Sequence, residues 1–196
     1  MKPTYRRLLI FVVALLVIAG GYFGYRLYAV SQRSVPQEFS EARSQGVIIS
    51  EKIISNSNDI AILVAKLSST TSTPAQASST LGEVLVKVDE VHSQAVELAA
   101  TLETMIKAVQ DIRMAEAQQA ALQAISQRLN LVSRLTNYTD DINRLATAIR
   151  LHLKTNAQNS KEIANLIRQI NSEVAAANSL SGLADESMAK FDALLR

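Results

Sequence analysis

The stretch Val84–Ile112, VLVKVDEVHSQAVELAATLETMIKAVQDI, places apolar residues at alternating steps of three and four. This spacing forms one apolar stripe along an α-helix and is typical of helices that pack side by side. The capping box Thr80-Leu81-Gly82-Glu83 precedes the stripe. The sequence therefore predicts a helix over residues 80–111, and its stripe consists of Val84, Val88, Val91, Ala95, Leu98, Leu102, Met105, Val109 and Ile112.

Three further segments show nearly the same spacing, which predicts helices over residues 37–68, 115–154 and 160–195. Because each helix has only one apolar face, the four must pack together or with copies of themselves. We expect an all-α fold, with residues 37–196 forming an antiparallel four-helix bundle; a looser coiled-coil oligomer is the alternative. The apolar stripes of these three further segments, in chain order, are Phe39, Ala42, Gly46, Ile49, Ile53, Asn56, Ile60, Leu63 and Leu67; Leu122, Ile125, Leu129, Val132, Leu135, Tyr138, Ile142, Leu145, Ile149 and His152; and Ile163, Ile167, Ile170, Val174, Ala177, Ser181, Ala184, Met188, Phe191 and Leu195.

The boundaries between these segments differ in clarity. Small polar residues and one proline fill residues 68–79, which are predicted to form a loop. No glycine or proline separates the second and third segments, so one helix of about 110 Å over residues 80–154 is an alternative. We favour a break between Gln110 and Glu116, because four segments of similar length can then fold against one another.

The N-terminal part of the chain contains an uncharged apolar run, Leu8–Tyr25, which reads LLIFVVALLVIAGGYFGY. As a helix these 18 residues span about 27 Å, close to the hydrocarbon thickness of a bilayer. Basic residues precede the run and tyrosines end it, as at membrane interfaces. The sequence predicts a transmembrane helix over residues 8–30, a short cytoplasmic tail over residues 1–7 and a juxtamembrane linker over residues 31–36.

Two alternatives concern this anchor. A cleaved signal peptide would have a similar charge pattern, but its run would be shorter and a small-x-small cleavage site would follow. Three basic side chains precede the run and two, Arg26 and Arg33, follow it, so the positive-inside bias favours a cytoplasmic N-terminus. We therefore expect a single-pass protein of the cell membrane whose C-terminal domain is extracytoplasmic.

Composition excludes several classes of chemistry. All 18 acidic residues but only 15 of the 20 basic ones lie at or after Glu38, so the domain is mildly acidic and nucleic acid is not expected as a partner. The chain has no cysteine, and Asp89-x-x-His92 is only half of a helical metal motif. Adjacent acids such as Asp140-Asp141 point in different directions around a helix, and we expect their side chains to face solvent. No catalytic residue, cofactor or metal site is expected.

The third segment is basic through Arg128, Arg134, Arg144, Arg150 and Lys154. Acidic residues on neighbouring helices explain this better than an acidic partner or a lipid surface, because the domain as a whole is not basic.

Three residues are candidates for an oligomer seam. Gly20 and Gly24 are four apart in the predicted span, where small residues let two helices approach closely, although glycine is also common in membrane helices. Asn56 occupies a stripe position, where such a residue often fixes register or oligomer state. The alternative for Asn56 is that the stripe drifts and its side chain faces water.

These features favour a membrane-anchored helical bundle with a structural or protein-interaction role. It would contact the bilayer through the N-terminal helix and bind a protein partner or a copy of itself. The alternative is a ligand-binding sensor bundle that acts through a partner membrane protein. An enzyme is the least favoured class, because the sequence shows no convergent set of reactive residues.

The layout of an N-terminal span and a helical bundle resembles the LemA family. The resemblance covers layout only, because Gly46-Val47-Ile48-Ile49-Ser50 stands where that family's Arg-x-x-Leu-Ile-Pro stretch would be expected. The segments Glu41–Gly46 and Asn137–Asp141 are also similar to uncharacterised bacterial single-pass membrane proteins with a helical extracytoplasmic domain. Neither resemblance implies an activity.

Overall fold

The computed structural model describes residues 35–67, 74–155 and 160–195. Within these ranges the chain is entirely helical and contains no strand, which confirms the predicted all-α helical bundle. The helices are α2 (Gln37–Leu67), α3 (Pro74–Val109), α4 (Ala115–Thr155) and α5 (Ser160–Leu195).

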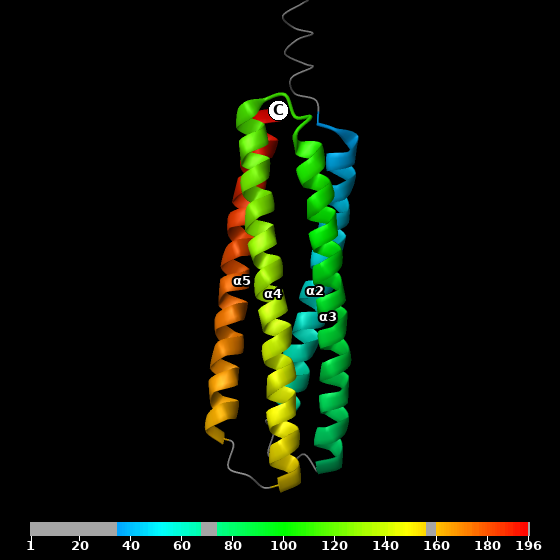
Figure 1. The fold of residues 1–196 in the computed structure, drawn as a ribbon, viewed down its shortest axis with the longest axis vertical. Coiled ribbons are helices and arrows are strands. Elements are labelled where there is room, and N and C mark those ends of the chain that lie inside the picture. Colours follow the sequence, from blue (N-terminus) through cyan, green and yellow to red (C-terminus); the bar gives the residue numbers. More distant parts are fainter. Residues whose placement is uncertain (1–34, 68–73, 156–159, 196) are drawn as a thin grey trace, which may run out of the picture.

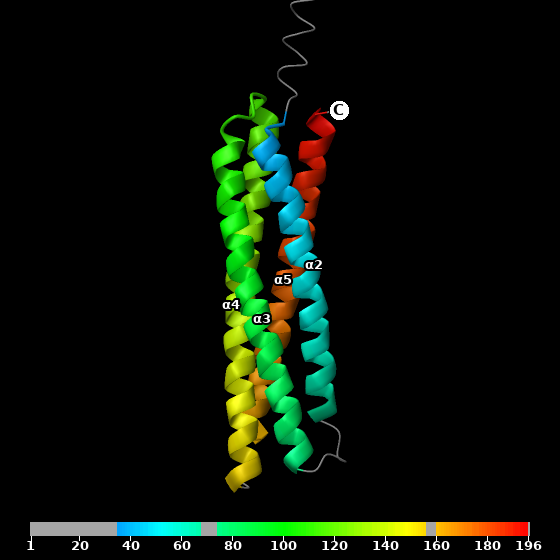
Figure 2. The same ribbon diagram turned by 90° about the vertical axis from the view of Figure 1, so that its right-hand side faces the viewer.

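The four helices form a slender up-and-down bundle (Figure 1). Helix α2 packs along α3, α3 along α4, and α4 along α5, while no Cα atom of α2 lies within 8 Å of one in α5. Figures 1 and 2 place the start of α2, the α3–α4 turn and the C-terminal end of α5 at the same end of the rod. The bundle is therefore two hairpins joined along α3 and α4.

Two helix boundaries bear on the predictions. Helix α3 begins at Pro74, six residues before the expected start at Thr80, so the predicted loop over residues 68–79 is too long. Proline is favoured in the first turn of a helix, and the residues that follow it are compatible with one. Between α3 and α4 the chain leaves helical geometry over residues 110–114, inside the interval where the sequence predicts a break.

Hydrogen bonds close the α3–α4 turn without a glycine. The amides of Asp111 and Ile112 donate to the carbonyls of Ala108 and Val109 at 3.2 and 3.1 Å. The Gln118 side chain donates to the same Val109 carbonyl at 3.3 Å. Ile112 is 3% exposed, so its burial helps to hold the turn against the end of the core.

The core follows the stripes closely in α3 and less closely elsewhere. All nine residues of the predicted stripe are buried, eight in α3 and Ile112 in the turn that follows. In the first part of α4, however, Leu122 and Leu129 are exposed, and four alanines pack beside the stripe residue Ile125 in the core: Ala117, Ala120, Ala121 and Ala124. The small alanines form the buried side of α4, which turns the leucines outward. The prediction that Leu122 and Leu129 are core residues is therefore wrong.

Helix α5 differs from its predicted stripe for another reason. Ile167 and Val174 are 38% and 42% exposed, while Leu166 is buried. Both exposed residues lie on the same side of α5 as Asp192, which contacts α2. The backbones of α2 and α5 stay more than 8 Å apart, so this side of α5 is only partly covered within the bundle.

Among the described residues, none of the helices α2 to α5 is both long and apolar enough to cross a membrane. The predicted tail, span and most of the linker, with Gly20 and Gly24, lie outside the described residues.

Candidate functional site

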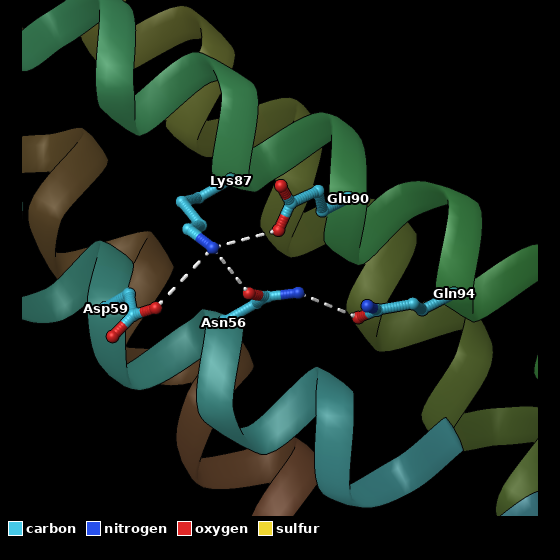
Figure 3. Close-up of polar contacts among 5 residues, drawn as sticks. All are labelled: Asn56, Asp59, Lys87, Glu90 and Gln94. Atoms are coloured by element: carbon cyan, nitrogen blue, oxygen red, sulfur yellow. Dashed lines mark hydrogen bonds and ion pairs between the residues drawn. The ribbon is translucent and has the colours of Figure 1, made fainter. Parts of the chain in front are cut away.

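The most extensive polar cluster lies between α2 and α3, where Figure 3 shows Asn56, Asp59, Lys87, Glu90 and Gln94 converging. Asn56 is only 8% exposed. Its amide nitrogen donates to Gln94 Oε1 at 3.2 Å, and its Oδ1 accepts from Lys87 Nζ at 3.0 Å. We call these five residues the Asn56 cluster.

Within the Asn56 cluster, Lys87 contacts both carboxylates. Its Nζ lies 3.0 Å from Glu90 on its own helix and 3.6 Å from Asp59 on α2. The hydrogen bond that Lys87 donates to Glu90, aided by the charges of Glu90 and Asp59, raises the pKa of Lys87. The amine therefore stays protonated and is a poor nucleophile, because a nucleophilic lysine needs a lowered pKa.

This arrangement suits a register lock better than catalysis. Asn56 is flanked on its stripe by the buried residues Ile53 and Ile60, so one polar position interrupts an apolar row. A one-turn slip of α2 against α3 would separate Asn56 from both of its partners and place it against apolar side chains. Burial excludes the alternative that Asn56 faces water. Its hydrogen bonds lie within one chain, and its predicted place on an oligomer seam stays a prediction.

A second polar cluster lies between α4 and α5 around Asp141. The sequence interpretation of Asp140-Asp141 as a solvated pair is wrong for Asp141, which is 3% exposed and whose Oδ2 has no hydrogen-bond partner. Its Oδ1 lies 3.5 Å from Arg144 Nη1. Burial, with the charges of Glu173 and Asp140, raises the pKa of Asp141 against the opposing effect of Arg144. Helical spacing distinguishes Asp141 from its exposed neighbour, because Asp141 follows the buried Tyr138 by three residues and precedes the buried Leu145 by four, whereas that neighbour lies on the opposite side of α4.

Two further side chains of α4 are buried near Asp141. Burial raises the pKa of Tyr138 to about 12, so the phenol is neutral at physiological pH. The Thr139 hydroxyl donates to the Thr136 carbonyl at 2.8 Å. Both side chains are therefore accounted for by packing and local hydrogen bonding.

The basic character of α4 is largely matched by nearby acids, as the sequence predicts. Arg134 pairs with Glu173 at 3.3 Å, and Arg128 pairs with Asp185 at 3.1 Å, both on α5. Arg128 is mostly covered, and its buried Nε has no hydrogen-bond partner. These contacts align α4 and α5, as the Asn56 cluster aligns α2 and α3.

A groove lies where α2 and α5 come together, at the end of the rod that holds the C-terminus. The Phe39 and Phe191 rings meet there with centroids 5.2 Å apart, and Arg43 forms a two-pronged ion pair with Asp192 at 2.6 and 2.8 Å. The hydrogen bond with Asp192 raises the pKa of Arg43. The groove beside them has a volume of about 460 Å³, and Val35, Val47 and Leu195 also line it.

The remaining candidates from the sequence do not assemble into a reactive site. Asp89 and His92 are both exposed on α3. In the part of the chain that the structure describes, no three His, Cys, Asp or Glu side chains gather in a geometry that could hold a metal ion.

Comparison with known proteins adds no further assignment. The chain matches no protein-family model, and no curated protein or solved structure is similar enough to count as a match. The resemblance to the LemA family stays a prediction.

Proposed function

We propose that this protein is a membrane-anchored helical bundle with a structural or protein-interaction role outside the cytoplasmic membrane. The N-terminal helix over residues 8–30 would anchor it, and the bundle would project from the bilayer to contact a protein partner or a second copy. Its polar clusters serve helix alignment rather than chemistry, which supports an interaction role over an enzymatic one.

One observation carries this proposal. The start of α2 lies at the end of the rod that holds the α3–α4 turn, and α2 runs from there toward the opposite end (Figures 1 and 2). The longest helix, α4, has 41 residues and extends about 60 Å. A bundle tethered through its first helix at one end would present its sides and far end to other molecules.

Topology is tested by labelling single cysteines, which is clean because the chain has none of its own. Ser172→Cys lies on an exposed part of α5, away from α2, and Thr4→Cys lies in the predicted cytoplasmic tail. We expect a membrane-impermeant maleimide to label Ser172→Cys on intact cells and Thr4→Cys only after lysis. The reverse pattern would invert the topology, and release of the bundle from membranes would indicate a cleaved signal peptide.

The interaction role is tested by cross-linking the full chain in native membranes and identifying what is captured by mass spectrometry. A recurrent foreign protein would support an adaptor role, and capture of copies of this chain would support self-assembly. A bundle that captures neither, in membranes that contain it at its natural level, would contradict the proposal.

A sensor role has one observation in its favour, the groove beside Phe39 and Arg43. A ligand there would stabilise the bundle by mass action. Thermal denaturation with a panel of small molecules tests this role, and a ligand whose effect disappears in Phe39→Ala would support it.

A further inference from the structure

We propose that a second copy of this chain packs, in parallel, against the open side of the bundle between α2 and α5. This deepens the proposed function by naming the partner, and the parallel arrangement rests on the proposed anchoring of both copies in one membrane. The surface is defined by helical positions that continue from the Arg43–Asp192 ion pair, and we call it the open face. It consists of Val47, Ser50, Ile54, Ser57 and Ala61 on α2, and Ile167, Asn171, Val174, Asn178 and Ser181 on α5.

The Arg43–Asp192 ion pair fixes which sides of the two helices belong to the open face. Ile54 follows Arg43 by about three helical turns, and Val174 precedes Asp192 by about five, so each lies on the side of its helix that turns toward the other. Beyond the ion pair and the Phe39–Phe191 contact, however, the helix backbones remain more than 8 Å apart. The two sides face each other without closing.

The open face exposes large aliphatic side chains on both helices. Ile54 is 59% exposed and Val47 is 43% exposed on α2, while Val174 and Ile167 are 42% and 38% exposed on α5. A run of apolar residues along two parallel ridges is typical of a surface that is covered in the assembled protein. The described helices cover these four side chains only in part, which leaves the open face available to a second copy.

The chemistry of the open face suits a copy of itself. None of its ten residues is charged. The charges on the same side, Arg43, Asp185 and Asp192, are already paired within the bundle. In a two-fold symmetric contact each patch meets the same patch, so an unpaired charge there would face its own like charge. Ser57, Asn171 and Asn178 each carry a donor and an acceptor and can therefore hydrogen-bond to their own copies, whereas the Ser50 hydroxyl already donates to the Gly46 carbonyl.

The first test uses matched charge substitutions in the full chain, purified in detergent, with the protein mass measured by light scattering over a range of concentrations. Ile54→Glu places a charge on the open face, and Val96→Glu on α3 is its control, because both side chains are 59% exposed. We expect Ile54→Glu to weaken dimerisation by roughly tenfold or more and Val96→Glu to leave it unchanged. Equal effects, or a wild-type chain that stays monomeric throughout, would overturn the proposal.

The second test measures which positions of two copies lie close together in membranes. In a parallel two-fold dimer, residue 54 of one copy lies at the height of residue 54 of the other, so Ile54→Cys should form a disulfide-linked dimer on mild oxidation. Val96→Cys controls for random collision and should form far less. A dimer linked equally well through both positions would place the contact on another surface and overturn the proposal.

The two tests separate this inference from the proposed function. If Ile54→Cys links to a foreign protein rather than to a second copy, the open face is an interaction surface and the interaction role stands, but self-association through it does not. If neither kind of product forms and native-membrane cross-linking also captures nothing, both the inference and the proposed function fail. Thermal melting of each Glu variant confirms that the bundle remains folded.

Discussion

At the scale of single residues, the bundle is held in register by polar groups placed inside apolar rows. Asn56 is the clearest case, because it hydrogen-bonds Gln94 and Lys87 across the α2–α3 interface while its stripe neighbours are buried isoleucines. The two partners are only half-buried, so water can replace Asn56 as their hydrogen-bond partner. At this position a polar side chain therefore specifies the register, whereas an apolar side chain would give the higher stability.

We expect Asn56→Leu to raise the free energy of unfolding by about 1 kcal/mol, because it extends the apolar row and leaves no buried polar group behind. Urea denaturation measures this change. Ser55→Leu adds the same side chain one position away, on the exposed side of α2, and should change stability by less than about 0.5 kcal/mol. A clear loss of stability in Asn56→Leu would mean that Lys87 and Gln94 are not resolvated.

Asp141 should make stability depend on pH. Its pKa is raised in the folded state by burial, so the folded protein holds this proton to a higher pH than the unfolded chain does. This contribution favours folding at low pH and is lost as the pH rises from the unfolded pKa through the folded one. We expect Asp141→Asn to be more stable than wild type by about 1–2 kcal/mol at pH 7. The advantage should disappear as the pH falls through the folded-state pKa.

The exposed neighbour Asp140 provides the control for this measurement. Asp140→Asn removes one charge from the same helical turn without changing a buried group, so its effect on the melting temperature should be small at every pH. If Asp140→Asn and Asp141→Asn give the same pH profile, the effect comes from net charge on α4 rather than from burial of Asp141.

At the scale of helices, two glycines lie in helix interiors where a side chain would meet open space. An added Cβ at Gly82 or Gly182 would have no neighbour within 4 Å. Alanine has a higher helix propensity than glycine, so Gly82→Ala and Gly182→Ala should each stabilise the bundle by about 1 kcal/mol. Thermal and urea denaturation of the single and double variants check this, and the distant sites should give additive effects.

Gly46 differs from these two glycines, because it is buried and its added Cβ would contact Leu98 and Thr101 at 3.7 Å. Alanine fits at this distance, but Gly46→Leu should destabilise the bundle by about 1–3 kcal/mol through overpacking. If Gly46→Leu is tolerated as well as Gly82→Ala, α2 and α3 pack less closely than the structure indicates.

The sequence predicts helices better than it predicts which of their sides are covered. The four helices and the α3 stripe follow from spacing, and the stripe is buried throughout because α3 packs between two neighbours. The break before Ala115 follows instead from matching the lengths of the segments. The same spacing also places Leu122 and Val174 in the core, yet both side chains are exposed. Their exposure depends on how α4 is rotated and on how far α5 lies from α2, which are properties of the assembled bundle.

A related limit applies to the polar groups. Asn56 stands out because it interrupts an apolar row, whereas Asp141 lies beside its row, three residues after Tyr138 and four before Leu145. This spacing places Asp141 on the apolar side of α4 and Asp140 on the opposite side, but it does not show which helix covers Asp141. The approach of α5, which brings Glu173 beside Asp141, is a property of the assembled bundle.

At the scale of the whole molecule, the bundle has two central and two peripheral helices. Helices α3 and α4 each pack along two neighbours, while α2 and α5 each pack along one and meet each other only through the contacts near the C-terminal end. Local opening is cheapest where the fewest apolar contacts are lost. The ends of α2 and α5 away from the Phe39–Phe191 contact should therefore open first.

Native-state hydrogen exchange tests this expectation. In the Ile54→Glu variant, which exposes the open face by weakening the proposed dimer, amides of α2 after Ile54 and of α5 before Val174 should exchange at least tenfold faster than those of central α3 and α4, because each opening there breaks a single helix–helix interface. Restoring Ile54 should slow exchange in the same two segments if a second copy covers them. Uniform protection of all four helices would show instead that the bundle opens as one cooperative unit, with α2 and α5 held as firmly as the central pair.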